Sequence, residues 1–350
     1  MQYKRWRVVA GKCLVNAVGA SAVLFVAACG GPASDAPAES DAPLVPQAEA
    51  DAETGLTLPA VWSTRALDGP VQDVALSTGP RPLLAIAFEG RGFQLFNLEG
   101  ERLGEPIGFG ITDLAGGQFA NLDGAAVTLF PGVDREGRLN IYLHGSNLPV
   151  PVEIPLPINA GNGALGLCAG APAQQESEGM PDGAVMRLGY WLEGAETTLE
   201  WGTLGVVEGA FTWSAEAPLT NATPLGGCRI PAQADAPLPV SGTPIAVADL
   251  ERPDGRYAVT LTAEGQLLAS GPGEGPQPVT LREGMSVRVP LPPVAMDAQG
   301  APLDGGYPFG LIVLAGETAP DVHQAVFVDT TPLVAPEGVD RMGVPAASAE

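Results

Sequence analysis

A series of short apolar runs, separated by glycine-containing turns, constrains the fold of this chain most strongly. Between residues 55 and 336 the sequence contains no convincing long amphipathic helix. It has instead short runs rich in branched and aromatic residues: Leu83–Phe88, Phe93–Phe96, Ala125–Phe130, Leu139–Leu143, Tyr257–Leu261, Leu311–Leu314 and Ala325–Val328. Runs of this kind, broken by turns every 8–12 residues or so, predict an all-β sandwich, barrel or propeller.

Several of the turns share one form, in which a glutamate or glutamine is followed directly by glycine. The examples are Leu98-Glu-Gly100, Arg135-Glu-Gly137, Ala263-Glu-Gly265 and Ala298-Gln-Gly300. Glycine at such a position supplies the positive φ that a tight hairpin needs. Recurrence at intervals of tens of residues indicates repeated sheets of about 40–50 residues, five or six in all. We therefore predict a β-propeller, with a pair of β-sandwiches as the alternative.

The N-terminal residues have the pattern of an export signal. Residues 1–7 are cationic, a mostly apolar stretch follows, and Val26-Ala-Ala-Cys29 matches the lipobox of bacterial lipoproteins. This pattern predicts a signal peptide over residues 1–28 and lipid attachment at Cys29. The alternatives are an ordinary signal peptide with an incidental cysteine, or an uncleaved anchor.

Residues 29–55 have the composition of a disordered tether. The segment contains four prolines, six acidic residues and no basic residue, so it lacks the apolar surface needed for a folded core. We expect it to join the lipid anchor to a folded domain over residues 56–336, with a flexible tail over residues 337–350.

The charge of the chain restricts its partners. The formal net charge is −23, and removal of residues 1–28, which contain four bases and no acid, would make it −27. Such a surface argues against nucleic acid and anionic lipid as partners, although strong acidity also serves solubility alone. The residue after the lipobox cysteine is Gly30. An aspartate at this position often retains bacterial lipoproteins at the inner membrane. We therefore expect this protein to be located at the outer membrane.

Two cysteines remain once the signal peptide and the lipid site are set aside. In an exported domain, Cys168 and Cys228 are most simply explained as a disulfide. Two free buried thiols are the alternative. A zinc site has less support, because His144 and His323 lie far away in the sequence.

Segments in the same order along residues 73–329 resemble the β-propeller phytases. Asp73–Leu76 with Leu84–Gly100 is similar to the first blade of that family, and Gly137–Tyr142 to the end of the second. Gly166-Leu-Cys168 resembles the family's Gly-Leu-Cys, and Tyr307–Val313 a strand of its last blade. The resemblance implies six blades, but the interval from Cys228 to Tyr307 is short by about one blade, so about five is the alternative.

The resemblance implies a Ca²⁺-dependent phosphohydrolase whose carboxylates gather Ca²⁺ while basic side chains hold phosphate. It makes Asp73, Glu89 and Asp304 the candidate Ca²⁺ ligands, and Arg91, Arg135 and Arg138 the candidate phosphate ligands.

Many of the basic side chains that this family uses are missing, however. The chain beyond residue 28 contains no lysine, and Gly226 stands where many members have glutamate. No residue is assigned a catalytic role.

Three functional hypotheses follow. The leading one is a non-catalytic accessory or binding module at the outer membrane, with a phytase-like fold and an envelope protein or an unidentified small molecule as partner. The second is a divergent Ca²⁺-dependent phytase or phosphomonoesterase that uses arginines in place of lysines. The third is a structural envelope protein that recruits a partner through its acidic surface. Fold alone does not choose among them.

Overall fold

The computed structural model describes residues 56–160, 163–171, 183–220, 243–252, 255–271, 275–303 and 306–333. All of them belong to one compact unit that spans residues 53–350. Within these ranges the secondary structure is almost entirely β, with a single turn of 3₁₀-helix at Thr331–Leu333. None of the described residues forms a helix long and apolar enough to cross a membrane.

The described strands form five four-stranded sheet units, which we call blades 1 to 5. Blade 1 contains β2 (Val71–Leu76), β3 (Leu84–Phe88), β4 (Gly92–Phe96) and β5 (Arg102–Ile107). Blade 2 contains β6 (Ile111–Leu114), β8 (Ala125–Asp134), β9 (Leu139–Gly145) and β10 (Val152–Pro155), with β7 (Gln118–Leu122) paired to β8. Blade 3 contains β11 (Ala164–Gly170), β12 (Ala184–Leu192), β13 (Thr198–Val207) and β14 (Ala210–Ala215), with β15 (Leu219–Thr220) paired to β13. Blade 4 contains β16 (Pro244–Arg252), β17 (Gly255–Thr262), β18 (Leu267–Ser270) and β19 (Gln277–Arg282).

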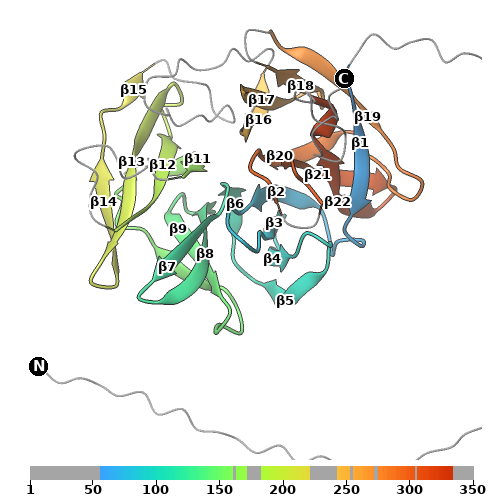
Figure 1. Ribbon diagram of the computed structural model, residues 1–350. Coiled ribbons are helices and arrows are strands. Elements are labelled where there is room, and N and C mark those ends of the chain that lie inside the picture. The colour runs from blue at the N-terminus through green and yellow to red at the C-terminus, as the bar shows by residue number, and fades with distance from the viewer. Residues whose placement is uncertain are drawn as a thin grey trace, which may run out of the picture. The chain divides into compact units, whose positions relative to one another are not determined.

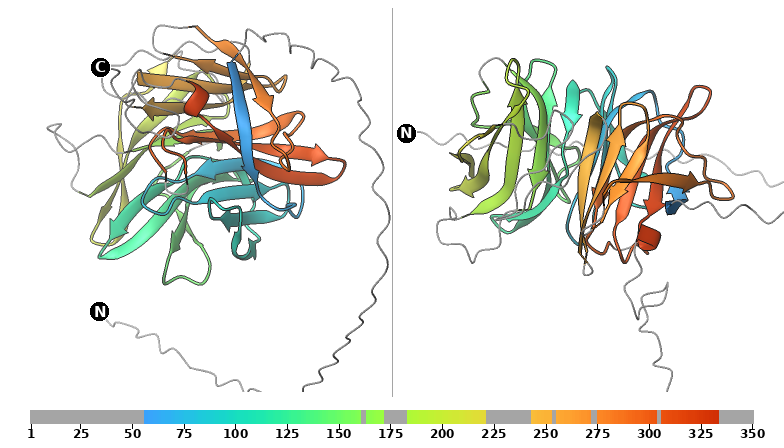
Figure 2. Two further views of the ribbon diagram at one scale, coloured as in Figure 1. Left: turned by 45° about the vertical axis from the view of Figure 1, so that its right-hand side comes forward. Right: turned by 90° about the horizontal axis from the view of Figure 1, so that it is seen from above.

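Blade 5 combines the two ends of the folded region. Its strands are β20 (Pro293–Gln299), β21 (Leu311–Ala319), β22 (Val322–Asp329) and β1 (Leu56–Ser63). β1 pairs antiparallel with β22 and parallel with β19, so that blades 4 and 5 share one eight-stranded sheet. Figure 2 shows β1, in blue, beside the orange and red strands of this sheet. The first strand of the fold is therefore held by the last ones.

The five blades surround a common centre, with β2, β6, β11, β16 and β20 innermost (Figure 1). The prediction of an all-β propeller is confirmed. Each innermost strand also begins with the same irregularity, a bulge after its first paired residue. The bulges lie at Val71/Asp73, Ile111/Asp113, Ala164/Gly166, Pro244/Ala246 and Pro293/Ala295. This recurrence identifies the blades as copies of one structural unit.

Apolar side chains fill the spaces between neighbouring blades. Ile86 of blade 1 packs with Phe327 of blade 5, and both are fully buried. Comparable clusters join blade 4 to blade 5, blade 1 to blade 2 and blade 2 to blade 3. In blade 1 the middle strands β3 and β4 are buried along their whole length, because both faces of that sheet are covered.

Three of the four predicted glycine turns are the same five-residue hairpin. They span Asn97–Glu101, Asp134–Arg138 and Thr262–Gln266, and in each the first residue's N–H donates to the carbonyl of the fifth. Their glycines have φ of +74°, +73° and +77°.

The prediction of a hairpin at Ala298-Gln-Gly300 is wrong. This segment ends β20, and a Cβ at Gly300 would lie 2.3 Å from the backbone N of Glu251. Gly300 is needed for close packing of blade 5 on blade 4 rather than for a turn.

Candidate functional site

Three aspartates with buried carboxyl groups lie on innermost strands of the propeller. Asp73 lies on β2, Asp113 on β6 and Asp297 on β20. Asp73 and Asp113 occupy the same place in their blades, directly after the bulge, and Asp297 lies two residues beyond it. A bulge leaves peptide groups without a ladder partner and re-aims side chains, which suits this position to a polar site.

Each of these carboxylates accepts a hydrogen bond from the backbone of the next blade. The Oδ2 atom of Asp297 accepts from Leu76 N, that of Asp73 from Leu114 N, and that of Asp113 from Leu167 N, each at 2.6 Å. Since buried N–H groups are costly to leave unpaired, these contacts stabilise the junctions from blade 5 through blades 1 and 2 to blade 3. We call them the inter-blade clasps.

The second carboxylate oxygen is also used in two of the three clasps. Asp73 Oδ1 accepts from Val74 N and Asp297 Oδ1 from Ala298 N, both at 2.8 Å. These two carboxylates therefore turn both oxygens toward backbone donors.

The surroundings of the three clasp aspartates favour the neutral, protonated form of the carboxyl group. Burial, followed by the nearby charge of Asp113, raises the pKa of Asp73 well above its usual value. Burial raises the pKa of Asp113 to about 6 and that of Asp297 to about 7. The charge of Asp113 opposes ionisation of Asp73, so the two buried carboxyl groups disfavour a state in which both are ionised.

The predicted Ca²⁺ ligands are not brought together where the structure describes them. Asp73 is engaged in the clasps, whereas Glu89 lies in the exposed turn between β3 and β4. Asp304 lies outside the described residues. In the part of the chain that the structure describes, no group of three or more Asp, Glu, His or Cys side chains is arranged to hold a metal ion. Ca²⁺ needs six to eight oxygen ligands, which Asp73 and Glu89 alone do not supply.

Two of the three predicted phosphate ligands lie around one turn. A Cβ on Gly90 would lie 3.3 Å from Arg135 Nη2, and Arg91 is the next residue in the chain. Arg91 donates from Nη1 to the carbonyl oxygen of Asp68, so its charge is not matched by a carboxylate there. Arg135 thus reaches the turn that carries Arg91, near the start of β2.

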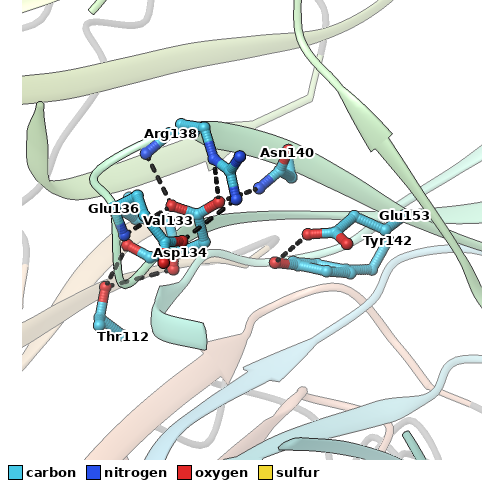
Figure 3. Close-up of polar contacts among 8 residues, drawn as sticks. All are labelled: Thr112, Val133, Asp134, Glu136, Arg138, Asn140, Tyr142 and Glu153. Carbon is cyan, nitrogen blue, oxygen red and sulfur yellow. Dashed lines mark hydrogen bonds and ion pairs between the residues drawn. The ribbon is translucent and has the colours of Figure 1, made fainter. Parts of the chain in front are cut away.

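The third predicted phosphate ligand, Arg138, is neutralised by the turn that carries it (Figure 3). Its Nε lies 2.6 Å from Asp134 Oδ2 and its Nη2 lies 3.1 Å from Glu136 Oε2. Asp134 also accepts from the backbone N of Glu136 and Arg138 and from Asn140 Nδ2. Burial opposes ionisation of Asp134, but these hydrogen bonds outweigh it and lower its pKa.

Of the cysteine predictions, only one residue can be placed. Cys168 is buried on β11 and is disulfide-bonded. Cys228 and Cys29 lie outside the described residues, so the pairing with Cys228 and the lipid site stay predictions.

The sequence interpretation missed Asp113 and Asp297. Either aspartate alone resembles many solvated acids in this chain. A detectable signal would have been an aspartate near the start of the first strand of successive repeats, as at Asp73-Val and Asp113-Leu. That signal depends on knowing the blade boundaries.

Comparison with known proteins identifies the fold and nothing finer. No family model matches the chain, and no curated protein matches it. Among solved structures, a mutant of AofleA from Arthrobotrys oligospora aligns with a TM-score of 0.44 and 12% identity, over 78% of this chain and 92% of that one. The Aleuria aurantia lectin in complex with α-methyl-L-fucoside gives 0.43 and 12%, over 81% and 99%. A thermostable family-43 glycoside hydrolase gives 0.38 and 14%, over 76% and 92%.

These likenesses concern the propeller arrangement of strands alone. Membership of the phytase family stays a prediction.

Proposed function

We propose that this chain is a lipid-anchored β-propeller that works as a binding module for an envelope partner and does not hydrolyse phosphate esters. The observation that carries the proposal is the use of Asp73, Asp113 and Asp297 as inter-blade clasps. Carboxylates that accept backbone N–H groups on their oxygens stabilise the ring, and both oxygens of Asp73 already accept such a bond.

The charge of the chain supports the same proposal. A net charge of −23 repels a polyphosphorylated substrate unless local cations compensate for it. Of the three candidate arginines, Arg138 is already paired with two carboxylates. An acidic propeller is better suited to recruit a partner with basic groups.

One observation favours a second candidate function, a divergent Ca²⁺-dependent phosphomonoesterase. Arg135 reaches the turn that carries Arg91, and neither arginine forms an ion pair with a described residue. Two guanidinium groups are the kind of donors that bind a phosphate.

The two candidates separate in one experiment on the full chain in mild detergent. Phosphate release from phytate is measured with and without millimolar Ca²⁺, for the wild type and for Arg135→Gln. The binding-module proposal predicts no release above the blank and no rise in melting temperature with Ca²⁺. Release that requires Ca²⁺ and falls in Arg135→Gln would establish the phosphomonoesterase instead.

A further inference from the structure

A pocket of about 350 Å³ lies at the seam between blade 5 and blade 1, away from the central aspartates. Its walls come from the end of β1, the end of β22, the β4–β5 turn and the segment before β21. The side chains that matter for the argument are Trp62, Leu98, Glu99, Tyr307 and Asp329. We call this the seam pocket. Its volume lies within the range of small-molecule and side-chain sites, which is roughly 300–1,000 Å³.

The aromatic wall is fixed in place rather than free to rotate away. Trp62 Nε1 donates to the backbone oxygen of Glu99 at 2.7 Å, while half of the Trp62 side chain stays exposed. A Cβ on Gly100 would lie 3.1 Å from Thr64 Cα and 3.3 Å from Trp62 Nε1, so the turn rests directly against β1. The indole face is therefore available at a defined position, which lowers the entropy cost of binding.

The seam pocket contains negative charge that no described residue neutralises. Neither Glu99 nor Asp329 forms an ion pair within the described ranges. Asp329 Oδ1 accepts from Thr331 N at 2.9 Å and from Thr331 Oγ1 at 2.7 Å, and Oδ2 has no such partner. Two carboxylates beside an ordered aromatic face attract a cation.

A mostly buried tyrosine lines the same space. Tyr307 is 8% exposed and forms part of the pocket wall. Burial, followed by the charges of Asp329 and Glu99, raises the pKa of Tyr307 to about 12. Its phenol group stays neutral at physiological pH, and its oxygen is a hydrogen-bond acceptor for a ligand.

We propose that the seam pocket binds an organic cation, an alkylammonium or guanidinium group, with the cation against Trp62 and its N–H donors on Asp329, Glu99 and the Tyr307 oxygen. The group belongs either to a free amine or to a lysine or arginine side chain of a polypeptide partner. The aromatic wall favours an organic cation over a metal ion, and the two unpaired carboxylates favour a cation over a neutral ligand. This inference goes beyond the proposed function and does not depend on the absence of hydrolysis.

The test is calorimetric titration of the full chain in mild detergent. The probes are agmatine, as a free cation, and a Gly-Arg-Gly peptide, with Gly-citrulline-Gly as the uncharged match. We expect the charged probes to bind and the citrulline peptide not to bind. Binding of the arginine peptide alone would assign the site to a polypeptide side chain, and binding of agmatine alone would assign it to free amines.

Two charge-removing variants and one control locate the site. Glu99→Gln and Asp329→Asn should each weaken binding about tenfold, since a hydrogen bond to a charged group contributes on that order. Glu99 uses only its backbone oxygen in the fold, so Glu99→Gln is not expected to affect folding. Asp321→Asn changes the net charge equally in the exposed β21–β22 turn and should leave binding unchanged.

Several results would overturn the inference. They are equal binding of the citrulline peptide, undiminished binding in both Glu99→Gln and Asp329→Asn, or an equal loss in Asp321→Asn. Ca²⁺ that binds at these carboxylates while agmatine and the arginine peptide do not would also overturn it. Phosphate release plays no part in this readout, so failure here is distinct from failure of the proposed function.

Discussion

Replacing Asp113 with asparagine should remove much of a pH-dependent loss of stability. The pKa of Asp113 is raised to about 6 in the folded protein, above its usual value of 3.8. A raised pKa means that the folded state binds the proton more tightly than the unfolded state. Its stabilising contribution is therefore complete below about pH 4 and is lost as the pH rises through about 6.

The size of the effect follows from the shift. A change from 3.8 to about 6 corresponds to about 3 kcal/mol, at about 1.4 kcal/mol per pH unit, as an upper figure. Asparagine carries no charge at any pH and still offers an acceptor for Leu167 N. It also removes the charge that helps to raise the pKa of Asp73, so the variant should lose that part of the pH dependence as well.

The assay is guanidinium denaturation of the full chain in mild detergent, at about pH 4.5, 6 and 7.5, with the disulfide intact. Between pH 4.5 and 7.5 the wild type should lose up to about 2 kcal/mol more than Asp113→Asn, because part of the full effect is already lost below pH 4.5. Asp123→Asn, in the exposed β7–β8 hairpin, gives the same change in net charge and serves as the control. An unchanged pH dependence in Asp113→Asn would refute the reasoning. Equal flattening in Asp123→Asn would assign the effect to net charge instead.

Three further predictions concern the turns, the Asp134 network and the anchor. Gly92→Ala should lower stability by more than about 3 kcal/mol in thermal melts, because φ is +112° and the new Cβ would lie against Ile107 O. Gly124→Ala, with φ of +82° and open space, should cost only about 1 kcal/mol, and equal costs would contradict this account. The lowered pKa of Asp134 contributes stability above its unfolded value of 3.8 that is lost as the pH falls, so acid titrations of Asp134→Asn should show a shallower decline than wild type. Cys29→Ser should release the protein in soluble form, and continued palmitate labelling would exclude Cys29 as the lipid site.

Local sequence patterns were sufficient to predict some of the strands. The runs at Leu83–Phe88, Tyr257–Leu261 and Ala325–Val328 lie in β3, β17 and β22, because each alternates or continues apolar residues over a strand length. The turn at Asp134–Arg138 was found through its glycine, whose positive φ few other residues adopt. These features depend on neighbours within a few residues, which a single sequence contains.

The pairing of strands that lie far apart in the sequence could not be predicted from such local patterns. β1 pairs with β19 and β22, more than 200 residues away, and nothing within Leu56–Ser63 identifies those partners. The inter-blade contact of Asp73 could not be predicted for the same reason. Its sequence match to a metal-binding family could not reveal that Leu114 N, 41 residues away, would occupy its carboxylate. The seam pocket is likewise assembled from four distant segments.

The most direct test of the central claim compares the stability and the phosphate release of wild type and Asp73→Ala. If Asp73 is a clasp, the variant should lose about 1–3 kcal/mol, because Leu114 N is left without its acceptor. Neither protein should then release phosphate from phytate, with or without Ca²⁺. The account would be contradicted by Ca²⁺-dependent release in the wild type that Asp73→Ala abolishes while its stability stays unchanged.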